Sequence, residues 1–137
     1  MRIAYVTETY PPELNGVSLT VERTVRFLRA RGHNVELIRP RQPGEAALDA
    51  NDELRTAGWP IPVYREMRFG VSRIAPLVRR FRATAPELVH LATPGPLSWA
   101  ALAAARALAR VGTNVCWVRL WKRRRTPSTG VASAPSP

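Results

Sequence analysis

Hydrophobic residues along the first forty positions follow two different spacings. The short apolar runs 2–7 and 34–40 each predict a buried strand. Between them, apolar residues recur every three or four positions, as on one face of an amphipathic helix, at Val17, Val21, Val25 and Leu28. Asn15 is a suitable N-cap for this helix, and Gly32 is a suitable left-handed residue to end it. The pattern predicts a strand–helix–strand unit, which places two parallel strands side by side.

The rest of the chain continues this alternation. The segment 41–59 holds Pro, Gly and scattered acids and is expected to be a loop. Further elements are predicted as strands over 61–65 and 86–92, a helix with the apolar face Ile74, Leu77, Val78 and Phe81, a helix over 97–108, and a fifth strand within 114–121. Alternating strands and helices indicate an α/β fold with a Rossmann-like, mostly parallel open sheet.

Composition divides the chain near residue 108. The 137 residues carry a net charge of +11, and residues 109–137 contribute six basic side chains and no acid. We therefore expect an α/β domain over residues 1–108 and a divergent basic tail over residues 109–137. Residues 122–137 are basic and then rich in Ser and Pro, so they cannot build a core and are predicted to be disordered.

Residues that bind metals or form disulfides are scarce. Cys116 is the single cysteine, so neither an intramolecular disulfide nor a thiolate zinc cluster is expected. We interpret His90 as a core histidine and His33 as a helix-capping or surface residue, because neither has a partnered Cys or spaced acids. No metal and no cofactor is therefore expected. The chain starts without a signal peptide and has no apolar stretch long enough to span a membrane, so the default expectation is a cytoplasmic protein.

A stiff, polar loop over residues 8–15 separates the first strand from the first helix. In open α/β sheets, ligands bind beyond the carboxyl ends of the strands, and this loop is the usual place for a phosphate. Asn15 and Gly16 stand at the helix start, where backbone N–H groups can approach an anion. From spacing alone, a phosphate site and a simple chain turn are equally good readings. The fingerprint G-x-G-x-x-G is absent, which disfavours a nicotinamide or flavin dehydrogenase.

Two blocks of sequence are similar to a known family. The blocks "MRIAYVTETYPPELNGVSLTVERTVRFLRARGHNVELIRP" and "PELVHLATPGPLSWAALAAARAL" resemble the N-terminal domain of family-4 glycosyltransferases, which have the GT-B fold. The resemblance spans residues 1–108 and is closest to bacterial mannosyltransferases that act on lipid or small-alcohol acceptors. It implies transfer of a sugar from a nucleotide-sugar donor to an acceptor with retention of configuration, without a metal.

The resemblance also implies a set of cleft residues. Gly16 would lie against the diphosphate or sugar of the donor, and Asn15 would shape the turn. Thr93, followed by Pro94 and Gly95, would lie at the same sheet edge. Three side chains of the first loop would border the cleft: Glu8, Tyr10 and Glu13. From the residues alone, the two glutamates are expected to be solvated loop residues, and no residue is assigned a catalytic role.

The resemblance ends near Ala109. The paired-glutamate motif and the basic diphosphate-binding residues of the family's C-terminal domain are not found, and the run after Ala109 is typical of out-of-frame reading of GC-rich DNA. The sequence therefore suggests a truncated or frameshifted product that is inactive by itself. A divergent natural tail is the alternative.

Two other classes compete with this interpretation. The first is a basic binding module. The arginine face Arg73, Arg79, Arg80 and Arg82 is expected to be a solvated helix surface or, alternatively, a contact with anionic lipid at the inner face of the membrane. The run Lys122–Arg125 is a possible phosphate contact, although no specific nucleic acid is expected as a partner. The second class is a Rossmann-like half that serves as a partner for another chain.

Overall fold

The computed structural model describes residues 1–13, 15–50, 52–62, 68–109 and 118–120. Within these ranges, the strands and helices follow the order β1 (Arg2–Val6), α1 (Gly16–Ala30), β2 (Asn34–Pro40), β3 (Leu48–Asp49), β4 (Glu53–Pro60), β5 (Arg68–Val71), α2 (Ile74–Thr84), β6 (Leu88–Leu91), α3 (Pro96–Ala109) and β7 (Val118–Leu120).

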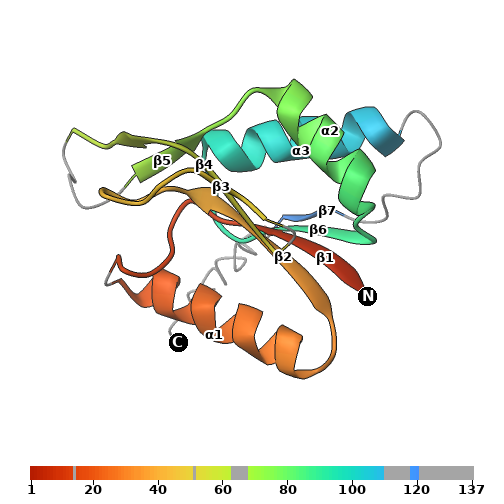
Figure 1. Ribbon diagram of the computed structural model, residues 1–137, viewed down its shortest axis with the longest axis horizontal. Helices are drawn as coiled ribbons and strands as arrows, with labels where there is room; N and C mark the ends of the chain where they lie inside the picture. Colours follow the sequence, from red (N-terminus) through yellow and green to blue (C-terminus); the bar gives the residue numbers. More distant parts are fainter. Residues whose placement is uncertain (14, 51, 63–67, 110–117, 121–137) are drawn as a thin grey trace, which may run out of the picture.

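The strands form one open sheet in the order β3-β4-β2-β1-β6-β7, with β5 paired to β4 (Figure 1). The strand β1 is parallel to its neighbours β2 and β6, β6 is parallel to β7, and β2 is parallel to β4. The strands β3 and β5 both run antiparallel to β4. This confirms the predicted α/β fold with a mostly parallel, Rossmann-like open sheet. The carboxyl ends of β1, β2 and β6 share one edge, because parallel strands end on the same side.

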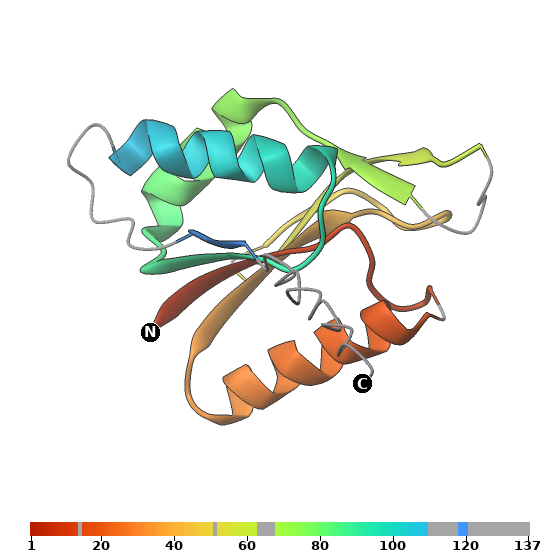
Figure 2. The same cartoon turned by 180° about the vertical axis from the view of Figure 1, so that it is seen from behind.

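The helices cover both faces of the sheet. Figures 1 and 2 show α1 on one face and α2 with α3 on the other. Side chains of β1 point alternately to the two faces, so Ile3 and Tyr5 pack under α1 while Ala4 and Val6 pack under α2 and α3. Each face therefore has its own apolar core, and the edge loops are presented by a rigid three-layer scaffold.

The helix α1 begins and ends where the sequence predicts. The side-chain oxygen of Asn15 accepts a hydrogen bond from the backbone N–H of Ser18 at 2.8 Å, and Ser18 Oγ accepts one from the Asn15 N–H at 3.3 Å, so the two residues form a capping box. Gly32 follows the helix with φ of 81°, a value that favours glycine. These features confirm the predicted N-cap and the predicted stop.

The predicted loop over residues 41–59 is wrong, because it contains β3 and most of β4. The sequence of β4, ELRTAGWP, lacks the alternation of apolar residues that predicts a strand, and most of its residues are half-buried or exposed. The predicted strand over 61–65 is also misplaced: Ile61 and Pro62 lie outside any strand, and residues 63–65 fall outside the described residues. The strand that pairs with β4 in this region is β5.

The predicted helices α2 and α3 are confirmed, with local differences. Val17 of α1 and Ile74 of α2 were expected to face the core but are about half exposed, at 50% and 47%. Arg80 does not belong to a solvated arginine face, because it forms ion pairs with Glu36 of β2 and Asp49 of β3. Only residues 118–120 of the predicted fifth strand are described, as β7, and the predicted disorder of residues 122–137 lies outside the described residues.

Candidate functional site

The loop between β1 and α1 is held by buried polar side chains. Glu13 is 8% exposed; its Oε2 accepts a hydrogen bond from Thr9 Oγ1 at 2.5 Å, and its Oε1 accepts one from Gln42 Nε2 at 2.7 Å. Asn15 Nδ2 donates to Thr9 Oγ1 at 2.9 Å. The loop is therefore tied internally and to the segment after β2, which fixes the start of α1 before any ligand arrives.

A second layer of charges lies beneath this loop. Arg39 of β2 is 3% exposed and forms ion pairs with Glu45 at 2.7 Å and with Glu53 at 2.8 Å. Its guanidinium group also lies 5.4 Å from the ring centroid of Tyr10. The hydrogen bond and charge of Arg39 hold the pKa of Glu45 at about 2, so that this carboxylate stays ionised well below neutral pH.

Glu8 is buried at the carboxyl end of β1, with 6% exposure. Its Oε1 accepts hydrogen bonds from the backbone N–H groups of Leu97 at 2.9 Å and Ser98 at 3.2 Å, and its Oε2 accepts one from Gly70 at 2.6 Å. Its own N–H donates to Thr93 Oγ1 at 2.7 Å. The expectation that Glu8 and Glu13 are solvated loop residues is therefore wrong.

The carboxyl group of Glu8 occupies the start of α3 as an internal anion. Burial raises its pKa, while the backbone hydrogen bonds from Gly70, Ser98 and Leu97 oppose that rise by favouring the ionised form. The space around it is filled, because a Cβ added at Gly95 would overlap the carboxyl group of Glu8. A Cβ added at Gly70 would lie 2.7 Å from the side chain of Leu97. Glycine at these two positions allows β5, β1 and α3 to meet.

A pocket of about 330 Å³ opens at this edge of the sheet. It is lined by residues from the loop after β1, the start of α1, the residue after β4, β5, and the loop after β6: Glu8, Thr9, Asn15, Val17, Ile61, Arg68, Phe69, Thr93 and Pro94. The structure thus brings Glu8, Asn15 and Thr93 together in one pocket. The sequence alone predicts only that they lie at the same edge of the sheet.

The other predicted site residues lie near this pocket without lining it. Gly16 is exposed at the start of α1, and a Cβ added there would meet no heavy atom within 4 Å. Tyr10 packs against the core under α1, and Glu13 is enclosed in the loop. Their assignment to a ligand stays a prediction, as does that of Asn15 and Thr93, while Tyr10 and Glu13 act structurally as supports for the loop.

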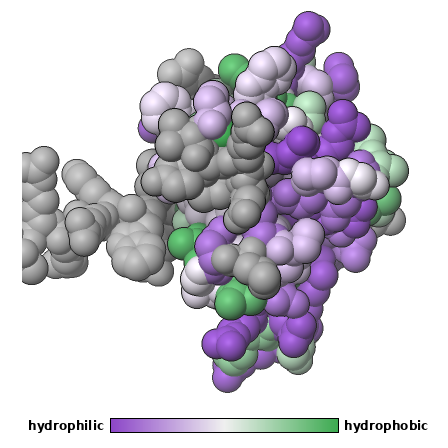
Figure 3. All heavy atoms as spheres, turned by 90° about the vertical axis from the view of Figure 1, so that its left-hand side faces the viewer, coloured by the Kyte–Doolittle hydropathy of each residue, from purple (hydrophilic) through white to green (hydrophobic). Residues whose placement is uncertain are grey.

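The residues of this edge that Figure 3 colours are mostly hydrophilic. In Figure 3, which faces the left-hand side of Figure 1, hydrophobic residues appear as separate small groups. In the part of the chain that the structure describes, no group of three or more His, Cys, Asp and Glu could hold a metal ion. None of the described helices has the length and apolar character needed to cross a bilayer.

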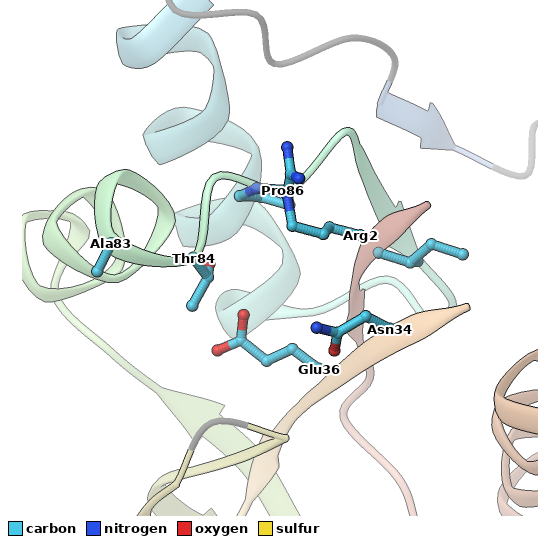
Figure 4. Close-up of a pocket in the computed structure, with 7 residues that line it drawn as sticks. Arg2, Asn34, Glu36, Ala83, Thr84 and Pro86 are labelled. Carbon is cyan, nitrogen blue, oxygen red and sulfur yellow. The ribbon is translucent and has the colours of Figure 1, made fainter. Parts of the chain in front are cut away.

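A second pocket, of about 270 Å³, lies at the opposite, amino edge of the strands. Figure 4 shows Arg2 of β1 and Asn34 and Glu36 of β2 reaching toward the end of α2, with the carboxyl group of Glu36 directed at Thr84. One oxygen of Glu36 binds Arg80, whereas the buried Oε2 has no hydrogen-bond partner. Burial raises the pKa of Glu36, and the hydrogen bond and charge of Arg80 oppose this. This carboxylate serves mainly to tie α2 to β2.

Sequence reasoning missed the part of the edge pocket that β4 and β5 supply. Ile61 belongs to the predicted strand over 61–65 but lies outside any described strand of the structure. Arg68 and Phe69 belong to β5, which the sequence pattern does not predict. The signal that could have found them is the pair of glycines at 58 and 70, which face each other across β4 and β5. Glycine inside a strand often marks a close approach of another chain segment.

An open, mostly parallel sheet with helices on both faces is a Rossmann-like fold, and the pocket lies at the carboxyl ends of the strands, where ligands bind in such folds. Residues 14–129 match the model of Glycosyltransferase Family 4. The chain belongs to this family and corresponds to the N-terminal region of its members.

Curated relatives agree with the family match. The chain is 36% identical over 113 residues to a GDP-mannose-dependent alpha-mannosyltransferase of Mycolicibacterium smegmatis, and 34% identical over 113 residues to one of Mycobacterium tuberculosis. A protein of Corynebacterium glutamicum with the same description is 32% identical over 119 residues. Each alignment covers 79% of this chain and only 27–30% of the relative, so the chain spans less than a third of the length of these proteins.

Proposed function

We propose that this chain forms the acceptor-side wall of a glycosyltransferase that transfers a mannosyl residue from GDP-mannose to an acceptor with retention of configuration. The observation that carries the proposal is the edge pocket, which gathers Glu8, Asn15 and Thr93 in a chain of family 4. The donor is proposed from the relatives, which are described as GDP-mannose-dependent.

The start of α1 is the part of the edge that we assign to the donor. Of the first three amides of α1, only that of Ser18 has a hydrogen bond within the described residues, so the amides of Gly16 and Val17 can donate to a diphosphate. Gly16 offers open space in front of them. Asn15 fixes the turn, Thr93 lines the same pocket from the loop after β6, and we assign no residue a proton transfer.

The acceptor is proposed to be a lipid or a small alcohol that is reached at the inner face of a membrane. Arg73, Arg79 and Arg82 are exposed, and Val71 and Ile74 flank Arg73 with 51% and 47% exposure. Basic and apolar residues exposed together favour contact with an anionic bilayer. Sedimentation with vesicles of anionic and of neutral lipid tests this contact, and an Arg79→Glu and Arg82→Glu double variant should lose the preference for the anionic vesicles.

A hybrid enzyme tests the proposed function. Residues 1–109 of this chain replace the aligned segment of the Mycolicibacterium smegmatis relative, and transfer of labelled mannose from GDP-mannose to membrane lipid is measured. We expect transfer by the hybrid and none by the 137-residue chain alone, because one wall of a cleft cannot position two substrates.

The Gly16→Val variant of the hybrid should lose at least tenfold in kcat/KM, since a branched side chain would occupy the space next to the amides of α1. The matched control is Ala30→Val, which places the same side chain at the exposed far end of α1. Equal activity of the two variants would show that Gly16 serves only as a turn, and turnover by the 137-residue chain alone would contradict the proposed division of roles.

A further inference from the structure

Arg68 is the one cation on the wall of the edge pocket, as far as the described residues show. It lies at the start of β5, opposite Pro60 of β4. Its Nη1 donates a long hydrogen bond to the backbone oxygen of Gly58 at 3.4 Å. Its Nε is buried and has no hydrogen-bond partner. A buried N–H without an acceptor is uncommon and costs free energy, so it calls for a physical explanation.

The position of Arg68 is set by close packing on both sides. A Cβ at Gly58 would lie 3.3 Å from Cδ of Arg68, which shows that the arginine stem passes directly over this glycine. Two residues along β5, Gly70 donates its N–H to Glu8 and packs against Leu97 of α3. The strand is thus held between β4 and α3, and Arg68 is presented to the pocket by a fixed backbone.

The charge of Arg68 is not neutralised within the pocket. Glu8 is the one acid on the pocket wall among the described residues. Both of its oxygens already accept backbone N–H groups, from Gly70 on one side and from Leu97 and Ser98 on the other. No ion pair joins Arg68 to an acid in the described part of the chain. The carboxyl group of Glu8 is thus engaged by backbone amides, and Arg68 has no acidic partner of its own in the described part of the pocket.

The shape of the guanidinium group indicates the ligand chemistry. Nε and the neighbouring terminal nitrogen form a planar edge that matches two oxygens of a phosphate or carboxylate. The wall also carries apolar side chains from four parts of the chain: Val17, Ile61, Phe69 and Pro94. Such a lining suits a ligand with an oxyanion next to an apolar portion.

We propose that Arg68 binds an oxyanion of the acceptor, and that the acceptor is a molecule with a phosphate or carboxylate group attached to an apolar body. The identification of this ligand as the acceptor rests on the proposed function, in which the donor diphosphate lies at the start of α1. Arg68 belongs to β5 and contributes a separate, charged wall. It is a specificity-determining residue, because it selects anionic over neutral acceptors.

Binding of simple probes to the 137-residue chain tests this assignment. Hexyl phosphate, hexanol and GDP-mannose are titrated separately by calorimetry or by NMR. We expect hexyl phosphate to bind at least tenfold more tightly than hexanol. Arg68→Gln should weaken hexyl phosphate at least tenfold and leave hexanol unchanged. Arg68→Lys keeps the positive charge but lacks the planar edge, so its affinity for hexyl phosphate should lie between those of the wild type and Arg68→Gln. The matched control Arg106→Gln, at an exposed arginine of α3, should stay within twofold.

The outcomes separate the inference from the proposed function. Equal binding of hexyl phosphate and hexanol to the wild-type chain overturns the assignment of Arg68, and this comparison needs no variant to fold. Equal binding of hexyl phosphate to the wild type and to Arg68→Gln overturns it too. If Arg68→Gln weakens GDP-mannose and not hexyl phosphate, Arg68 belongs to the donor and the inference is wrong. Loss of hybrid activity on Gly16→Val concerns only the proposed function, since it leaves Arg68 unchanged.

Discussion

The starts of α1 and α3 lie at the same edge of the sheet, but their free backbone N–H groups find hydrogen-bond acceptors in different ways. At α3, Pro96 has no N–H, and the amides of Leu97 and Ser98 donate to the buried carboxyl group of Glu8. At α1, the side-chain amide oxygen of Asn15, which is neutral, accepts a hydrogen bond from one backbone amide, that of Ser18. Both helix starts attract anions, but the anion at α3 is supplied by the chain itself. The start of α1 is the one that can accept an anion from outside.

The glycines near the two helix starts reflect the same difference. Gly95 precedes α3 and has no room for a side chain, because the carboxyl group of Glu8 fills the space. Gly16 opens α1 and faces empty space. A glycine is therefore needed before α3 for packing. At α1 the fold does not require one, and any requirement there must come from a ligand.

The largest effect is expected from Glu8→Ala. The substitution leaves three buried amides, those of Gly70, Leu97 and Ser98, without an acceptor. Since each costs about 1–3 kcal/mol when unpaired, the free energy of unfolding should fall by about 3–5 kcal/mol after partial relaxation. Urea unfolding measures this. Glu22→Ala, which removes the partly exposed partner of the exposed Arg26, is the control and should change stability by about 0.5 kcal/mol or less.

A loss in Glu8→Ala no larger than in Glu22→Ala would mean that water replaces the carboxyl group at α3. The two helix starts would then be equivalent, and the comparison would fail.

The next largest effect is expected from Gly95→Ala. The added Cβ must displace the carboxyl group of Glu8, and overpacking of this kind typically costs about 1–3 kcal/mol. Gly16→Ala is the matched variant: its Cβ enters open space, and alanine favours a helix, so stability should stay unchanged or rise slightly. Chemical unfolding of both variants side by side decides the matter, and a stable Gly95→Ala together with a damaged Gly16→Ala would reverse the comparison.

The strands and helices that carry these helix starts can be predicted from the sequence, but the binding of the Glu8 carboxyl group at the start of α3 cannot. The strands β1 and β2 and the helix α1 are visible as local periodicity, and Asn15 and Gly32 mark the helix ends by residue type. The role of Glu8 depends on Gly70 and Leu97, which lie 62 and 89 positions away. A local pattern contains no information on such contacts, so a single acid after a strand is naturally interpreted as solvated.

The missed strands have a related cause. A four-residue strand such as β5 is too short to show a period, and Gly70 within it normally disfavours a strand. Its pairing with β4 and its position beside α3 come from tertiary contacts of Gly58 and Gly70. As a consequence, the charged wall with Arg68 could not be predicted, although the polar edge with Asn15 and Thr93 could.

Acid pH should affect the supports of the two helix starts in opposite directions. Near α1, Arg39 holds the pKa of Glu45 at about 2, below its usual value of 4.5. A lowered pKa stabilises the fold above pH 4.5, and this stabilisation is lost as the pH falls toward 2. At α3, burial raises the pKa of Glu8, so protonation of Glu8 favours the native state as the pH falls through its raised pKa.

The variant Glu45→Gln isolates the first effect. It should lower the free energy of unfolding by about 1 kcal/mol at neutral pH, a figure that allows for solvent screening of this partly exposed pair. The difference from the wild type should vanish as the pH falls from 4.5 toward 2. Unfolding curves at several pH values measure it, and a difference that persists at pH 2 would show that Glu45 acts by packing and not by charge.

The smallest effect is expected from removing residues 122–137, which should disturb neither helix start. These residues contain a single β-branched aliphatic side chain, Val131, and three prolines. Burial of so little apolar surface cannot offset an ordering cost of roughly 1–2 kcal/mol per residue. The thermal midpoint of the shortened chain should therefore stay within about 2 °C of the original. Hexyl phosphate should bind the shortened chain as before, since Arg68 is unchanged. A fall of many degrees, or a loss of binding, would mean that the tail packs on the domain and contributes to the edge on which the two helix starts lie.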